Sequence, residues 1–375
     1  MPFSRAIWVE VSRPAIASNV EKVSARAGDQ KLIAVVKANA YGHGLTGTAV
    51  ALRDAGVSEF AVASLGEGFE LRNAGIGGKD ATILILGYSQ PSHATEVVES
   101  GFCQTVISVH EIRALAGAAE KLGKQAKVQI KIDTGMHRLG APPGDFPRLL
   151  DALKRFPMVQ LEGVYTHYAA ADEADNPITR KQFKLFKKTI PSNGFEKKVT
   201  LHASNSSALI NFPRLKLDAV RVGIALYGEY ASPNVPRKLD LTPVLNLKSR
   251  IAEVKTVKPK DGAGYNHRFV NNTKEPIRLG ILPVGYADGF MTRSSGTREV
   301  LVRGRRCRVV GSVSMDFVHI LLPDDLRIGV GEPVTLLGGD GEDRITAEEL
   351  AKLYGTHVYE ILCLIPTRIP RKYVD

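Results

Sequence analysis

The chain has 375 residues, of which 44% are hydrophobic and 24% charged, a composition that excludes a disordered chain, collagen and a coiled coil. At roughly 150 residues per domain, this length predicts two domains. The net charge of +11 would suit a nucleic-acid-binding protein, but the basic residues are spread out and their densest cluster, at 303–308, is short.

Short β-branched and apolar runs alternate with helical patterns between about residue 30 and residue 225. Strands that alternate with helices pair in parallel. The number of runs matches a closed (β/α)8 barrel of the TIM type, with a doubly wound open sheet as the alternative. We therefore predict an α/β fold whose N-terminal domain, residues 1–233, is a barrel. The expected strands are Leu32–Val36, Phe60–Ala63, Thr82–Leu86, Thr105–Ile107, Val128–Ile132, Leu161–Thr166, Val199–His202 and Leu217–Val220. The expected helices are Gly47–Ala55, Gly66–Asn73, Ser92–Ser100, Val109–Leu122, Asp145–Phe156, Thr179–Thr189 and Ser204–Phe212.

The pattern changes after about residue 235, where strand-like runs are joined by turns and few helical patterns occur before Ala347–Tyr354. This arrangement predicts a mainly antiparallel β domain over residues 234–375. An earlier strand-like run, Ala6–Val11, has no obvious helical crossover into the barrel and could pair with the second domain. The expected strands of that domain are Leu245–Val257, Ile277–Val284, Glu299–Val302, Cys307–Val310, Val318–Leu322 and Pro333–Leu337.

Cellular location and metal content are constrained by what the sequence lacks. No stretch approaches the roughly 18 apolar residues of a membrane helix, and the first residues lack the apolar core of a secretory signal. The three cysteines have neither the spacing of a disulfide framework nor that of a metal site. We therefore expect a cytoplasmic protein with no metal, no membrane partner and no nucleic-acid partner.

Polar and charged residues follow five of the expected barrel strands, where barrel enzymes carry their functional residues. A lysine partly removed from water has a lowered pKa and can form a Schiff base with a carbonyl. N–H and hydroxyl groups after the seventh and eighth strands form the usual phosphate site of a barrel. This chemistry suits pyridoxal 5′-phosphate (PLP), whose ring nitrogen Arg221 could face. The strand-end residues are Lys37, Lys131, His167, Asn205 with Ser206, and Arg221 with Gly223 and Ile224.

Motifs along nearly the whole chain resemble those of the alanine racemases, PLP-dependent isomerases with an N-terminal barrel and a C-terminal β domain. They occur in the family's order. The resemblance implies interconversion of L-alanine and D-alanine by a head-to-tail homodimer, which in a bacterium would supply D-alanine for peptidoglycan. The matching motifs are AVVKANAYGHG at 34–44, KIDTGMHRLG at 131–140, THYAAAD at 166–172, RVGIALYG at 221–228, Gly264-Tyr265, LPVGYADGF at 282–290, SMD at 314–316 and VYEILCLIPTRIPR at 358–371.

The resemblance also implies a role for individual residues. Lys37 would hold PLP and act as one catalytic acid and base, and Tyr265 of a second subunit would be the opposing one. Lys131 matches a lysine that the family carbamylates, and its new carboxylate would orient Arg138. The implied cofactor contacts are Lys37, Tyr41, Arg138, His167, Asn205, Ser206, Arg221, Gly223, Ile224 and Tyr359. The implied substrate contacts are Arg138, Met315 and Tyr286.

Racemisation requires that a proton leave one face of Cα and return on the other, which a lysine and a tyrosine on opposite faces can divide between them. The phenol of Tyr265 has an ordinary pKa of about 10, and we expect His167 and Arg221 to lower it. Arg221 would hold its own proton rather than give it to the ring nitrogen, which makes the ring a weaker electron sink.

Some positions depart from the family pattern. Ser314 stands where cysteine is usual, and Asn266 follows Tyr265 where glycine is frequent. Thr292 and Ser312 occupy positions where many alanine racemases place arginines that narrow the substrate corridor. The substrate range is therefore less constrained by the sequence than the reaction type, and a broader racemase acting on serine or basic amino acids is one alternative.

Other readings of the same residues are weaker. A PLP-dependent decarboxylase of this fold would carry a carboxylate at the ring nitrogen, where this chain has Arg221. A non-catalytic PLP-binding protein of the single-barrel type would lack the second domain and Tyr265. Lys131 could also form a simple ion pair with Asp133 instead of being modified.

Overall fold

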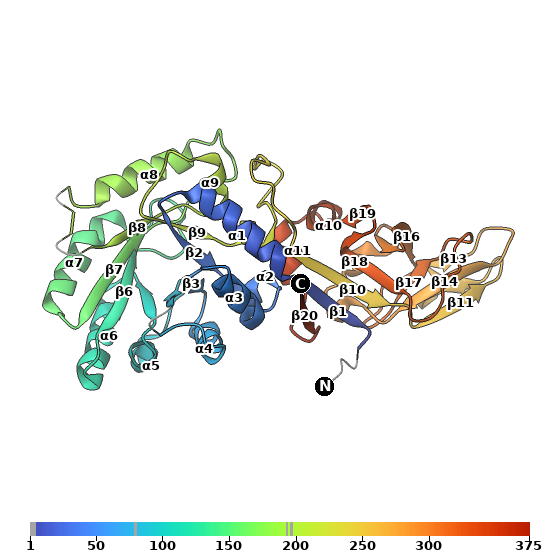
Figure 1. The fold of residues 1–375 in the computed structure, drawn as a ribbon, viewed down its shortest axis with the longest axis horizontal. Coiled ribbons are helices and arrows are strands. Elements are labelled where there is room, and N and C mark those ends of the chain that lie inside the picture. The colour runs from blue at the N-terminus through green and yellow to red at the C-terminus, as the bar shows by residue number, and fades with distance from the viewer. Residues whose placement is uncertain (1–4, 79–80, 193, 196–197) are drawn as a thin grey trace. The chain divides into compact units, whose positions relative to one another are not determined.

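The computed structural model describes residues 5–78, 81–192, 194–195 and 198–375, which form two compact units (Figure 1). The barrel unit consists of residues 16–41 and 45–242. The sheet unit consists of the residues up to Ala15, residues 42–44 and residues 243–375. None of the helices in the described part of the chain has the length and apolar character that crossing a lipid bilayer requires.

The barrel unit contains parallel strands that close on themselves, because β9 pairs with β2 through Ala219 and Lys31. The strands are apolar on both faces, as the burial of residues 60–62 illustrates, since one face lines the barrel core and the other meets helices. The predicted (β/α)8 fold is confirmed. The strands are β2 (Lys31–Val35), β3 (Glu59–Val62), β4 (Thr82–Ile85), β5 (Cys103–Val106), β6 (Ala126–Lys131), β7 (Val159–Tyr165), β8 (Thr200–His202) and β9 (Ala219–Val222).

Helices flank the outside of the barrel strands (Figure 1). Each predicted helical pattern corresponds to a helix within a few residues at either end. The sequence showed no obvious helical crossover after the first strand-like run, whereas α1 (Arg13–Ala27) begins directly after that strand. The helix carries a weak amphipathic pattern, which explains why its sequence did not reveal it. The others are α3 (Leu45–Asp54), α4 (Leu65–Asn73), α5 (Ala94–Glu99), α6 (Val109–Leu122), α7 (Phe146–Arg155), α8 (Ile178–Thr189) and α9 (Ser206–Asn211).

The sheet unit is built on one mainly antiparallel sheet with the strand order β11-β14-β17-β16-β15-β18-β10-β1-β20. Strand β1 (Ile7–Ser12) pairs antiparallel with β10 and parallel with β20. The single strand expected over 245–257 is two, because residues 251–252 interrupt it. The other strands are β10 (Leu245–Arg250), β11 (Glu253–Val257), β14 (Ile277–Leu282), β15 (Glu299–Val302), β16 (Arg305–Val310), β17 (Val318–Leu321), β18 (Pro333–Asp340), β19 (Asp343–Ile345) and β20 (Arg371–Val374). The smaller elements are the paired strands β12 (Gly262–Ala263) and β13 (Phe269–Val270), and the helices α10 (Ala347–Tyr354) and α11 (Val358–Cys363).

The basic cluster at 303–308 lies on the β15–β16 hairpin and is compensated by carboxylates. Arg306 forms ion pairs with Glu299, Asp343 and Glu349 at 3.3, 2.8 and 2.8 Å. Arg303 and Arg305 each pair with a further carboxylate. With three of its four arginines paired to carboxylates of the same chain, this cluster has a reduced attraction for a polyanion.

Candidate active site

The residues expected to form the site fall into two groups, one in each unit. The barrel group lies at or just after the carboxyl ends of the barrel strands, the end at which TIM-type barrels carry their sites. Its members are Lys37, Tyr41, Lys131, Arg138, His167, Asn205, Ser206, Arg221, Gly223 and Ile224. The sheet-unit group is Tyr265, Tyr286, Met315 and Tyr359.

Lys37 begins an unusual turn that the sequence did not predict. It is the first residue of α2 (Lys37–Tyr41), in which residues 38–41 have φ angles between 52° and 55°. This left-handed backbone costs an L-residue roughly 1–2 kcal/mol at each position. Strain of this kind gathers at functional sites and persists where the surrounding structure holds it. The segment that carries Lys37 and Tyr41 is therefore held by contacts outside itself.

Tyr41 ends this turn beside Gly223, the residue that follows β9. A Cβ atom on Gly223 would lie 2.5 Å from the Tyr41 hydroxyl oxygen, so a larger residue does not fit there. Ser206 Oγ accepts the Gly223 N–H at 3.2 Å, which leaves the serine hydroxyl hydrogen as a donor. Asn205 caps α9 through its side chain, and Ile224 is buried directly after Gly223. These groups form a small cradle of N–H and hydroxyl donors.

Arg221 is a buried charge surrounded by neutral acceptors. Its Nη1 donates to His202 Nδ1 at 2.6 Å, and its Nη2 donates to the carbonyl oxygens of Thr166 and Ala203 at 2.7 and 3.0 Å. His167 Nδ1 lies 3.4 Å from the same Nη2. Among the described residues, no carboxylate pairs with Arg221 and its Nε–H makes no hydrogen bond. Burial lowers the pKa of Arg221 to about 10, so the group stays charged at neutral pH.

The hydrogen bond from Arg221 determines the protonation state of His202. A guanidinium only donates, so Nδ1 of His202 accepts and the ring proton lies on Nε2, which donates to Gln129 Oε1 at 2.8 Å. Burial and the neighbouring Arg221 hold the pKa of His202 and of His167 well below the usual value. Both rings are neutral, so His167 brings no positive charge of its own to the site.

Lys131 ends β6 and is almost fully buried among other cations. Its Nζ lies 5.7 Å from the centre of the Tyr165 ring. Burial, together with Arg221 and Arg138, lowers the pKa of Lys131 to about 8. Among the described residues it forms no ion pair with Asp133, whose Oδ1 instead accepts the N–H groups of residues 135–137 at 3.0 Å. A substantial part of the Lys131 amine is therefore neutral near pH 8.

In the sheet unit, Tyr265 projects into solvent from a tight turn. It is 72% exposed and begins a 3₁₀ turn over Tyr265–His267 that follows Gly264, whose φ is 74°. Asn266, which stands where the family often has glycine, has a φ of 54°. Asparagine tolerates this left-handed region better than most residues do, so the exchange preserves the turn. Tyr359 is half-buried on α11, with its ring edge toward His357.

Tyr286 and Met315 lie on two segments that are hydrogen-bonded to each other. The N–H of Tyr286 donates to the Ser314 carbonyl oxygen at 3.0 Å, and the N–H of Ala287 donates to that of Met315 at 3.1 Å. A Cβ atom on Gly285 would lie 2.2 Å from both carbonyl oxygens, so this approach requires glycine. The two exposed side chains expected to contact substrate are thus carried on one backbone unit.

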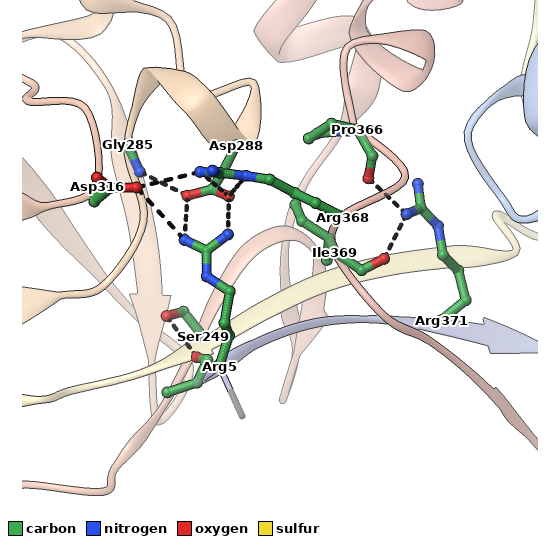
Figure 2. A network of polar contacts seen from close by, with 10 residues as sticks. Arg5, Ser249, Gly285, Asp288, Asp316, Pro366, Arg368, Ile369 and Arg371 are labelled. Carbon is green, nitrogen blue, oxygen red and sulfur yellow. Dashed lines mark hydrogen bonds and ion pairs between the residues drawn. The ribbon is translucent and has the colours of Figure 1, made fainter. Parts of the chain in front are cut away.

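Asp288 anchors these segments through a network that we call the Asp288 clamp (Figure 2). Its side chain is fully buried and accepts both Nη groups of Arg5 at 2.6 and 3.0 Å and the Nε of Arg368 at 2.9 Å. It also accepts the Gly285 N–H at 3.2 Å. Arg368 reaches Asp316 at 3.3 Å, so it bridges the segments that carry Tyr286 and Met315.

Sequence reasoning missed the residues beneath the barrel site. His202 was expected only as a strand end, and neither Gln129 nor Tyr165 was singled out. The Tyr165 ring stacks on that of His202 with centres 4.8 Å apart, and the Arg221 guanidinium also lies over it at 4.8 Å. Because successive side chains of a barrel strand point inward and outward in turn, the strand positions of Gln129, Tyr165 and His202 could have placed them inside the barrel. The sequence does not identify their partners.

Known proteins share this arrangement of a barrel unit followed by a sheet unit. The family model for the alanine racemase N-terminal domain matches residues 11–231, and that for the C-terminal domain matches residues 244–373. The chain belongs to the alanine racemase family. The alanine racemase of Symbiobacterium thermophilum is 40% identical over 371 residues, covering 98% of this chain and 97% of that one.

Solved structures agree with the family assignment. A Clostridium difficile alanine racemase superposes with a TM-score of 0.92 at 35% identity, with 99% of this chain and 96% of that chain covered. A histidine racemase from Leuconostoc mesenteroides superposes with a TM-score of 0.91 at 26% identity, with 100% and 99% covered. The fold is therefore shared by racemases that are named for different amino-acid substrates.

The barrel group fits PLP, the cofactor of the alanine racemase family. The absence of a Cβ on Gly223 lets the Tyr41 hydroxyl approach, and the hydroxyl groups of Tyr41 and Ser206 suit a phosphate. The Arg221 Nε–H is a donor suited to an unprotonated ring nitrogen. Lys37 supplies an amine at the same end of the barrel. The barrel group thus offers partners for the phosphate, the ring nitrogen and the aldehyde of PLP.

Proposed function

We propose that this protein is a PLP-dependent alanine racemase that interconverts L-alanine and D-alanine. Two observations support it: membership of the alanine racemase family, and the gathering at one barrel mouth of a lysine, a donor cradle and a buried arginine that has no carboxylate partner among the described residues. The observation that carries the proposal is Arg221, a buried cation whose described partners are all neutral. A carboxylate in its place would favour a decarboxylase.

The barrel residues would hold the cofactor and fix its orientation. Lys37 would hold PLP through Nζ, Tyr41, Ser206 and the backbone at Gly223 would bind the phosphate, and Arg221 would donate to the ring nitrogen. Asn205, Ile224, His167, Arg138 and Tyr359 would complete the binding site. PLP, when bound, withdraws electrons from Cα of the substrate amino acid and so makes the Cα proton removable. Arg221 keeps its proton and limits that withdrawal, which favours prompt return of a proton to Cα.

Two bases would then divide the inversion. Lys37 Nζ would exchange the proton on one face of Cα and the Tyr265 hydroxyl on the other. We infer that Tyr265 comes from a second copy of the chain, in a head-to-tail homodimer. The exposure of Tyr265, Tyr286 and Met315 on the sheet unit supports this, because large exposed side chains of this kind suit an interface. Tyr286 and Met315 would contact the substrate beside Arg138.

Lys131 would carry a carbamate. Its lowered pKa supports the modification, since only a neutral amine attacks CO2. The neutral nitrogen would form a bond to the CO2 carbon as one C=O π bond opens, and the nitrogen would release one proton, which converts a neutral amine into a carbamate anion beside Arg138. We place the enzyme in the cytoplasm, which the three free cysteines, one of them exposed, support.

A complementation experiment tests the two-base arrangement and the shared site together. Lys37→Ala and Tyr265→Phe should each lower the racemisation rate by about 10³-fold, the size of effect expected when a general acid–base group is lost. Co-expression of the two variants with different tags should yield heterodimers in which one site has both bases, so activity should return. Heterodimers as inactive as the parents would overturn the shared site.

Substrate identity is tested on the wild-type protein in D2O. Incubation with L-alanine should give D-alanine with deuterium at Cα, and borohydride reduction should attach PLP to Lys37. Parallel incubations with serine, lysine and histidine measure the breadth of the substrate range. Faster exchange on one of these than on alanine would contradict the assigned substrate while leaving the reaction type in place.

A further inference from the structure

The left-handed turn after Lys37 is held at its first residue by a side chain from the neighbouring strand–helix unit. The N–H of Ala38 donates to Glu67 Oε1 at 2.7 Å. At the far end of the turn, the N–H of Leu45 donates to Asn39 Oδ1 at 2.8 Å. The bond from Ala38 is the nearer of the two to Lys37, because it involves the adjacent peptide.

Glu67 also belongs to the capping box that begins α4. Its Oε2 accepts the N–H groups of Ala63 and Ser64 at 2.7 and 3.3 Å, while the Ser64 hydroxyl oxygen accepts the Glu67 N–H at 3.3 Å. The two carboxylate oxygens are therefore divided, with one on the helix start and the other on the turn after Lys37. The side chain of Glu67 therefore connects, by hydrogen bonds, the residues that follow β2 with those that follow β3.

A second capping box in the same barrel shows what the motif needs by itself. Glu111 belongs to the capping box at the start of α6, and its Oε2 accepts the N–H groups of Ile107 and Ser108 at 2.8 and 2.9 Å. Within the described residues, Oε1 of Glu111 makes no hydrogen bond. One oxygen is enough for a capping box. The bond from Ala38 to Oε1 of Glu67 is additional to capping.

We propose that Glu67 is a positioning residue for Lys37, which fixes the peptide after the lysine and so the place of its amine in the barrel mouth. This inference rests on the proposed function. A carboxylate suits the task because it accepts on both oxygens at once. Glutamine has one accepting oxygen, so at position 67 its NH2 group would face either the Ala38 N–H or the capping N–H groups.

The test compares Glu67→Gln with Glu111→Gln, which makes the same chemical change in a capping box remote from Lys37. Ser64→Ala is a second control, because it weakens the α4 cap and leaves the Ala38 bond in place. For each purified apoprotein we would measure urea unfolding, the dissociation constant for PLP by absorbance titration and the rate at which borohydride fixes PLP to Lys37. The alanine kcat and KM of each holoenzyme complete the set.

Glu67→Gln should weaken PLP binding about tenfold, slow the fixing of PLP to Lys37 and lower kcat roughly 10- to 100-fold, the range expected for a misplaced reactive group. The KM for alanine should change by less than about threefold, and the urea midpoint should match that of Glu111→Gln. Both controls should keep PLP binding and kcat near wild type.

The possible failures are distinguishable. If the wild type racemises alanine but Glu67→Gln matches Glu111→Gln in PLP binding and kcat, the positioning role is overturned and the proposed function stands. The positioning role is also overturned if Ser64→Ala impairs PLP binding as strongly as Glu67→Gln, because loss of the cap would then account for the effect. A wild-type protein that neither binds PLP nor racemises alanine would overturn both proposals.

Discussion

Arg221 in the barrel unit and Asp288 in the sheet unit are each the buried charged centre of a polar network, but their partners differ. Arg221 donates to a histidine nitrogen and to backbone carbonyl oxygens. Asp288 accepts from two guanidinium groups, those of Arg5 and Arg368 (Figure 2). One charge is solvated by dipoles, and the other is neutralised by opposite charge.

This difference separates a binding site from a structural anchor. A buried charge without a counterion is costly to hold and keeps its field available to a ligand. The electric field of a buried charge inside an ion-pair network is cancelled by its partners. Such a network fixes the segments that carry the partners. Loss of Arg221 should therefore mainly affect chemistry, and loss of Asp288 should mainly affect folding.

Among the variants that test this difference, Arg221→Met should have the largest effect. Racemisation should fall by about 100-fold or more, because a preorganised charge at the reacting group is lost. The free energy of unfolding of the apoprotein should change by less than about 1 kcal/mol, because removal of an unpaired buried charge offsets the lost hydrogen bonds. Chiral chromatography and urea unfolding measure the two quantities. A large loss of stability would show that Arg221 is an anchor after all.

Asp288→Asn should give the opposite pattern. Breaking a buried charge network costs several kcal/mol, and with both arginines partly exposed we expect about 2 kcal/mol in the free energy of unfolding. The turnover of the folded fraction should fall by less than about tenfold. Asp316→Asn is the matched control, since Asp316 is half exposed and should cost less than about 1 kcal/mol. Equal costs for the two variants would contradict the anchor role of Asp288.

The smallest effect concerns the pH dependence of stability. The native pKa of Lys131 is lowered to about 8, whereas an unfolded lysine has a pKa of about 10.4. Between these values the unfolded chain binds more protons, so the free energy of unfolding should rise with pH. The CO2-free wild-type apoprotein should gain about 1 kcal/mol between about pH 8 and pH 9 relative to Lys131→Met. Parallel curves for the two proteins would remove the basis for a neutral amine at position 131.

Most of the fold followed from patterns that the sequence displays directly. The barrel strands were predicted because runs buried on both faces are continuously apolar, and helix α6 was predicted with its exact bounds. Helix α1 was missed because its sequence is only weakly amphipathic, although the buried residues Ile16, Val20 and Val23 recur at helical spacing. The run at 245–257 hid a break at residues 251–252, where one strand leaves its partner and the next begins with another.

The site followed less completely. The site residues were predicted from motifs shared with the alanine racemases. The structure brings together those that belong to the barrel unit. The neutral state of His167 depends on burial and on neighbouring cations from three strands, which no local pattern encodes. Glu67 and Glu111 stand in identical Ser-x-x-Glu motifs, so only the fold shows that the spare oxygen of one meets the residue after Lys37.

The pairing of β1 with β10 and β20 has a consequence for biosynthesis. Ribosomes deliver residues 31–222, which hold every barrel strand, before either neighbour of β1 has been made. The barrel can close while β1 waits as an unpaired nascent segment, and the sheet unit is completed only when β20 emerges. Polypeptides released before β20 is made would leave one edge of β1 unpaired and open to other chains, which makes early release an aggregation hazard.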